Sequence, residues 1–285
     1  MTESTQEQIK KHFSQKGGEV FWPSDLSRIL TQNRSLWGVS GLRFNDFLDF
    51  LTKNSLVKIA AFTSPKYDAI TRYVHGGPSN YRLALSLRHH SFLSHATALA
   101  LHRFEPASNT IFVNQEQATK SNDSELTQAG IRAAFKNQQR KSQYVFHYNK
   151  NSYVLLSGKN TERAGVVQLL TPEGETVDST DLERTLIDIV VRPAYSGGIK
   201  RVAAIYNAAN NRINIDYLIE LLNGIEYLYP YQQSIGFLLQ RAGQPEKSLK
   251  KLEALRSSFD FFLDYGIKHP VYDERWQLYY PEELA

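Results

Sequence analysis

Residues 93–104 read LSHATALALHRF and residues 181–190 read DLERTLIDIV, and these two stretches decide the predicted fold. Apolar residues recur at helical spacing in both, so each predicts a helix with a buried face. Ser94 is suited to cap the first helix, and Thr180 with Glu183 matches a capping box before the second. The simplest interpretation makes both stretches core helices that carry no chemistry.

The region before these stretches predicts a winged helix-turn-helix domain over residues 1–78. The expected elements are helices at 2–15, from 23 and at 42–54, a short strand at 20–21, and strands at 56–62 and 68–74. Phe44, Phe47, Leu48 and Leu51 form one apolar stripe on the third helix. Three helices followed by a hairpin is the order of a DNA-binding winged helix.

The remaining residues, 79–285, predict a mixed α/β part over 79–192 and a mostly helical part over 193–285. Strand-like runs lie at 110–114, 142–147, 152–156 and 166–170, with helices at 126–139 and 180–191. Helices are expected at 199–207, 215–222, 229–240 and 246–256, before an aromatic tail at 257–285. The predicted fold class is α+β.

Composition favours a protein of the cytoplasm with no membrane segment. The 285 residues include no cysteine, which excludes disulfides and thiolate chemistry. No run approaches the roughly 20 apolar residues of a membrane span. The net charge of +4 is uneven, because residues 1–160 carry 20 basic and 11 acidic residues against 13 and 18 in the rest. A basic N-terminal half suits nucleic-acid contact.

We expect double-stranded DNA to bind the winged helix, with its third helix in the major groove. The polar and basic residues that would contact DNA on or beside the helices and hairpin are Arg28, Arg34, Arg43, Asn45, Lys53, Lys58, Lys66 and Arg72. Two acidic residues on the same helix, Asp46 and Asp49, oppose this reading because they repel phosphate.

A second basic surface, for nucleic acid or a partner protein, is expected further along the chain. Arg132, Lys136 and Arg140 recur every four residues and would share a helix face with Lys141 beside it. Lys200 and Arg201 are weaker candidates at the start of the helical part.

No enzyme is predicted, and neither a metal ion nor a cofactor. Residues 158–160 read GKN without the rest of a phosphate loop, and no G-x-G-x-x-G or G-x-S-x-G occurs. Four histidines lie between residues 89 and 102, but no cysteine or HExxH arrangement accompanies them. Packing or surface roles explain these histidines.

The serine–histidine start of the first stretch and the ERTLID run at 183–188 resemble the AbiEi family of antitoxin-repressors. The resemblance extends from the winged helix to the trailing helices, although Leu182 stands where many relatives have proline. It implies repression of the protein's own promoter through inverted repeats. It also implies a cognate nucleotidyltransferase toxin as partner, in a type IV system that limits phage infection. Glu183, Arg184 and Asp188 match the family run, where an Arg184–Asp188 ion pair is expected.

Two other interpretations stay open. The chain could be a protein-interaction module that docks a partner through its acidic C-terminal region without binding DNA, or an unrecognised nucleic-acid-processing enzyme. The sequence leaves the operator and the oligomeric state open.

Overall fold

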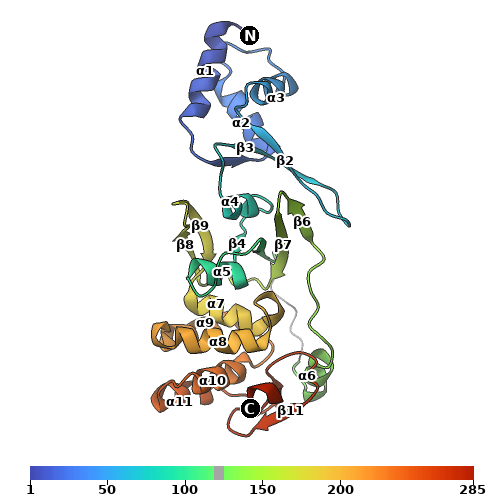
Figure 1. Ribbon diagram of the computed structural model, residues 1–285, viewed down its shortest axis with the longest axis vertical. Helices are drawn as coiled ribbons and strands as arrows, with labels where there is room; N and C mark the ends of the chain where they lie inside the picture. Colours follow the sequence, from blue (N-terminus) through green and yellow to red (C-terminus); the bar gives the residue numbers. More distant parts are fainter. Residues whose placement is uncertain (119–124) are drawn as a thin grey trace.

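The computed structural model describes residues 1–118 and 125–285 as an elongated α+β molecule (Figure 1). The N-terminal helices lie at one end, a six-stranded sheet lies in the middle, and helices α7 to α11 lie at the other end. The apolar core is correspondingly divided into clusters along the long axis.

The N-terminal end contains three helices and a three-stranded antiparallel sheet. The helices are α1 (Glu3–Ser14), α2 (Pro23–Asn33) and α3 (Phe44–Lys53), and the strands are β1 (Glu19–Phe21), β2 (Lys58–Phe62) and β3 (Ile70–His75). The strand order is β1-β3-β2. Phe47 and Leu51, from the predicted stripe of α3, are fully buried with Ile9, Phe13 and Leu26. Burying this stripe fixes which face of α3 remains in solvent.

A mixed sheet of order β6-β7-β5-β4-β9-β8 forms the middle of the molecule. Its strands are β4 (Phe92–Leu93), β5 (Thr110–Glu116), β6 (Val145–Tyr148), β7 (Asn151–Gly158), β8 (Val166–Leu170) and β9 (Thr176–Thr180), accompanied by the helices α4 (Asn80–Leu85), α5 (His95–Leu101) and α6 (Gln128–Phe135). Parallel β5–β7 and β4–β9 pairs alternate with antiparallel ones.

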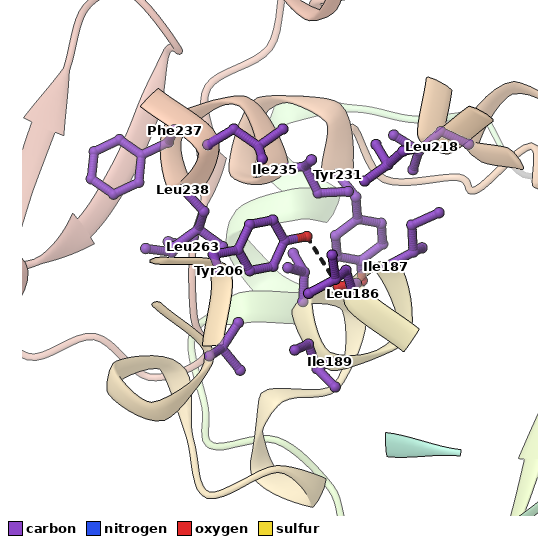
Figure 2. Close-up of a cluster of buried hydrophobic side chains, with 14 of the residues drawn as sticks. Leu186, Ile187, Ile189, Tyr206, Leu218, Tyr231, Ile235, Phe237, Leu238 and Leu263 are labelled. Atoms are coloured by element: carbon purple, nitrogen blue, oxygen red, sulfur yellow. Dashed lines mark hydrogen bonds between the residues drawn. The ribbon is translucent and has the colours of Figure 1, made fainter. Parts of the chain in front are cut away.

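The C-terminal end is built around the helix that contains the ERTLID run. The helices are α7 (Leu182–Val191), α8 (Ile199–Ala209), α9 (Ile215–Ile225), α10 (Tyr231–Arg241) and α11 (Glu246–Glu253), with the strands β10 (Phe261–Phe262), β11 (Pro270–Asp273) and β12 (Leu278–Pro281). Figure 2 shows Leu186 and Ile187 of α7 in the same apolar cluster as Ile235 of α10, and the Tyr206 hydroxyl donates to the Leu186 carbonyl oxygen at 3.0 Å. The aromatic tail at 257–285 contains the short strands β10, β11 and β12.

Two predicted helix starts differ in detail from the structure. Ser94 makes no side-chain cap bond, because its hydroxyl contacts the neighbouring His95 ring at 2.9 Å. The second helix is capped by Asp181, which accepts the Arg184 backbone N–H at 2.8 Å. The predicted capping box is therefore wrong, since Thr180 belongs to β9 and Glu183 accepts from the Asn214 backbone instead.

The helix predicted over 126–139 is shorter, and this divides the second basic surface. Helix α6 ends at Phe135, with Lys136 as its C-cap. Arg140 lies in the irregular segment that leads to β6, so the prediction that it shares a helix face with Arg132 is wrong. Strand β9 was not predicted, because its sequence TVDST mixes polar residues with one large apolar residue.

The β2–β3 hairpin connects the N-terminal end to the middle sheet. Thr63, beyond the end of β2, exchanges two backbone hydrogen bonds with His147 of β6, at 3.0 and 2.7 Å. The Tyr67 ring stacks on Tyr144 at a centroid distance of 4.3 Å. Phe62 packs into the same apolar cluster as the sheet residues. These contacts fix the hairpin tip against the second part of the chain.

Candidate nucleic-acid interface

The exposed face of α3 carries polar residues of both charges. Asn45, Asp49 and Lys53 are exposed at successive i, i+4 positions, opposite the buried stripe. Arg43, just before the helix, pairs with Asp46 at 2.9 Å. This hydrogen bond raises the pKa of Arg43 and lowers that of Asp46. The exposed face therefore offers the amide of Asn45 and the cations Arg43 and Lys53 to a ligand. Asp46 competes with such a ligand for Arg43.

The other predicted contacts around α2 and β2 are divided between free and engaged groups. Arg28 pairs with Asp25 at 2.6 Å on the surface of α2. Arg34 donates to the Val39 and Ser40 carbonyl oxygens, at 3.2 and 2.9 Å, and so stabilises the loop before α3. Lys58 is exposed on β2. Lys58 is thus available at the surface, and Arg28 is exposed but paired with Asp25, whereas Arg34 has a positioning duty.

Arg72 does not lie on the surface predicted for the hairpin. It is only 4% exposed, and its guanidinium donates to the Ser86 carbonyl oxygen at 2.7 Å. The guanidinium also lies 3.4 Å from the ring centroid of Trp22, which stacks in turn on His89 at 3.9 Å. Burial lowers the pKa of Arg72 to about 10. Because its donors are used inside the protein, Arg72 joins the two parts of the chain, and the prediction that it marks an exposed wing is wrong.

Lys66 also faces the second part of the chain. Its ammonium nitrogen lies 2.5 Å from the Gln143 side-chain oxygen, beside the Tyr67–Tyr144 stack. Sequence reasoning missed this placement because the residues in contact are more than 70 positions apart. Lys66 is therefore beside a groove of the second part.

The residues of the predicted second basic surface lie in three different environments. Arg132 and Lys136 are exposed on α6 and its C-cap. Arg140 and Lys141 line a groove of about 660 Å³ that also contains Arg192 and, within residues 1–118 and 125–285, no carboxylate. Lys200 and Arg201 are neutralised by Glu283 and Glu105, at 2.9 and 2.6 Å. Of the six residues of this predicted surface, Arg140 and Lys141 lie together in the groove, where no ion pair with a described residue neutralises them.

A buried polar centre lies where the two quoted stretches meet. His95, Asn114, Arg184 and Asp188 line a cavity of about 40 Å³ and are each at most 5% exposed. Arg184 Nε donates to Asp188 at 2.9 Å, so the expected ion pair is confirmed. One polar atom of His95, one of Asn114 and one of Asp188 have no partner within the described protein residues. A cavity of this size with convergent polar atoms suits bound water.

The buried polar centre imposes unusual conditions on His95. Burial lowers its pKa to about 4, so the ring is neutral at physiological pH. Its backbone has φ of +53°, a left-handed conformation that costs energy in a residue other than glycine. The sequence carried a signal for this centre, because polar residues occupy both faces of an otherwise apolar helix at 182–190. Their burial could not be deduced without the packing of α9 and α10.

Comparison with known proteins supports the fold alone. No protein-family model matches the chain, and no curated protein matches it. The crystal structure of the RV2827C protein from Mycobacterium tuberculosis is similar, with a TM-score of 0.58 and 14% sequence identity. The alignment covers 98% of this chain and 92% of that one, so the similarity extends over the whole architecture.

Two further observations concern the described residues. No helix in residues 1–118 or 125–285 is long and apolar enough to cross a membrane. Within the same ranges, no group of three or more His, Cys, Asp and Glu side chains is placed to hold a metal ion.

Proposed function

We propose that this protein is a DNA-binding transcriptional repressor that also acts as the antitoxin of a type IV toxin–antitoxin pair. The observation that carries the proposal is the arrangement of residues 1–78. Helix α3 packs against α2 through one face, exposes Asn45 and Lys53 on the other, and is followed by the β2–β3 hairpin. This order and exposure support a winged helix whose third helix enters the major groove.

The antitoxin role rests on the resemblance to the AbiEi family. The serine–histidine start and the ERTLID run lie side by side in the buried polar centre, which supports a shared structural purpose for them. In this proposal α7 and its neighbours form the scaffold, and the acidic C-terminal part faces a nucleotidyltransferase toxin. Co-expression with the product of the adjacent open reading frame tests this role, because an antitoxin restores growth and a bystander does not.

Promoter binding is tested with a duplex that contains the region upstream of the gene. The double variant Arg43→Ala/Lys53→Ala removes two phosphate-contacting cations. It should weaken binding at least about tenfold and flatten the plot of log affinity against log salt by about 2 units. The matched control is Lys247→Ala/Lys250→Ala on α11, which removes equal charge at the opposite end of the molecule (Figure 1).

In the same experiment, the Arg72→Ala variant distinguishes the loss of a DNA contact from the loss of protein stability. Because Arg72 is buried, its loss should lower stability while the salt dependence of promoter binding stays at the unmodified value. Unchanged promoter affinity in Arg43→Ala/Lys53→Ala would remove α3 from the mechanism.

A protein-interaction module is the second candidate function. Leu36 and Ile59 of the N-terminal part are 71% and 57% exposed, and Arg43 and Arg28 are already paired with carboxylates. Exposed apolar residues, together with cations that are already paired, favour protein contact over phosphate contact. Co-purification with the adjacent gene product, without retention on promoter DNA at low salt, would favour this function.

A further inference from the structure

The groove between α6 and the middle sheet is lined largely by one extended segment. Residues 137–144 run along it, Leu155 and Leu156 of β7 contribute to its lining, and Arg192 and Tyr265 lie on the side of the C-terminal helices. Its volume of about 660 Å³ is within the range of ligand-binding clefts, roughly 300–1,000 Å³.

Hydrogen bonds hold the extended segment in place. The Ser142 backbone N–H donates to the Tyr195 hydroxyl at 2.7 Å, and the Ser142 hydroxyl donates to the Leu155 carbonyl oxygen at 2.7 Å. Gln139 accepts the Ala194 backbone N–H at 3.0 Å. The groove is therefore formed before any ligand arrives, which reduces the ordering cost of binding.

The electrostatics of the groove select an anion. Arg140, Lys141 and Arg192 line it, and among the described residues its lining includes no Asp or Glu. Arg140 and Lys141 make no hydrogen bond or ion pair with any described residue. An adjoining recess contains Asp264, whose pKa is raised by burial.

Aromatic side chains supply the second component of recognition. Tyr144 is 45% exposed at the groove, backed by the stacked Tyr67 ring. The Arg88 guanidinium lies 5.4 Å from the Tyr144 ring centroid and donates to the Leu156 carbonyl oxygen. Tyr265 lines the opposite end and stacks on Phe135 at 4.4 Å. Cations that follow a backbone, combined with supported aromatic rings, form the usual platform for unpaired nucleotides.

We propose that this groove binds a single-stranded nucleic-acid segment, with phosphates on Arg140, Lys141 and Arg192 and a base packed against the exposed part of Tyr144. The extended shape of residues 137–144 suits a linear ligand, and the volume accommodates about one or two nucleotides but not a duplex. This site is separate from α3, so it does not depend on the proposed repressor function.

The test measures fluorescence anisotropy of a 5′-fluorescein-labelled oligothymidylate of about 12 nucleotides with the full chain. Three phosphate contacts predict a slope of log affinity against log salt near −2. Arg140→Ala/Lys141→Ala should weaken binding at least about tenfold and flatten the slope by about 1.4 units. Tyr144→Leu should weaken binding about fivefold or more without changing the slope.

Two controls separate the groove from general surface charge. Arg132→Ala/Lys136→Ala removes the same charge from exposed positions that do not line the groove, and should change affinity by less than about twofold. Arg43→Ala/Lys53→Ala should keep oligothymidylate binding whether or not it loses promoter duplex. A matching oligouridylate identifies whether the segment is DNA or RNA, because only the 2′-hydroxyl differs strongly between them.

The proposal is overturned if Arg140→Ala/Lys141→Ala binds the oligomer like the unmodified protein, or if the α6 control loses as much affinity. Equal loss of a blunt duplex in Arg140→Ala/Lys141→Ala would also overturn it, because the groove residues would then be part of a duplex contact. Circular dichroism and thermal unfolding of each variant establish that it is folded.

Discussion

Replacing Asp188 with alanine tests the buried polar centre that joins the two quoted stretches. The side chains of Arg184 and Asp188 are 2% and 6% exposed, and Arg184 Nε lies 2.9 Å from Asp188 Oδ1. Burial alone would lower the pKa of Arg184, but the Asp188 charge and hydrogen bond raise it above its usual value. Arg184 therefore stays charged in the core, and its ion pair depends on Asp188.

Removing one partner of a buried ion pair leaves an uncompensated charge, which costs about 3–5 kcal/mol. Thr161 and the Ala164 carbonyl oxygen still accept from Arg184 in the Asp188→Ala variant, so the lower half of this range is expected. For a chain of this size the loss lowers Tm on the order of 10 °C.

Urea unfolding at pH 7.5 measures this cost, with Asp216→Ala as the matched control. Asp216 pairs with Lys251 at 2.5 Å, but both side chains are well exposed, so its loss should cost less than about 1 kcal/mol. The double variant Arg184→Met/Asp188→Leu should recover most of the loss, because apolar residues replace the whole pair. A cost below 1 kcal/mol for Asp188→Ala would refute the reasoning and indicate that water reaches the pair.

The remaining predictions concern pH and packing. Folding lowers the pKa of His95 from 6.5 to about 4, so the folded protein binds a proton at His95 less readily than the unfolded chain does. The contribution of His95 to the free energy of unfolding is therefore complete above pH 6.5 and is lost as the pH falls toward 4. Between pH 7.5 and 5 the free energy of unfolding should fall by about 2 kcal/mol more than in His95→Asn; equal pH dependence would contradict this. In helix α10, Gly236→Ala places a methyl group 2.1 Å from the Trp276 ring and should cost about 1–3 kcal/mol despite the better helix propensity. In Gly224→Ala, in α9, the added methyl group meets no atom within 4 Å, so this variant should instead stabilise the protein by about 0.5–1 kcal/mol. Thermal scans in which both variants shift Tm in the same direction would disprove the packing argument.

Most helices and strands could be predicted from the sequence, because periodicity records which face of an element is buried. The stripe on α3 identified its core residues, and the i, i+4 spacing of Arg184 and Asp188 identified their ion pair. Short-range geometry sufficed for these predictions. Capping was harder, because Asp181 and Thr180 are both good caps and only the path of β9 selects between them.

Tertiary structure alone decided which charges are available to a partner. Arg72 and Lys53 are both cations in the N-terminal part, yet contacts with Trp22 and Ser86 bury the first and leave the second in solvent. Burial of a charge depends on carbonyls and rings brought in from distant parts of the chain, and no local pattern encodes that.

The same reason explains the groove and the buried polar centre. Arg140 becomes part of a groove because α6 ends early and the following segment runs from α6 to the edge strand β6. His95 and Asp188 meet because α5 packs on α7, 93 positions further along the chain. Amphipathic spacing is a property of one element, whereas a site is a property of several, and only the folded chain brings them together.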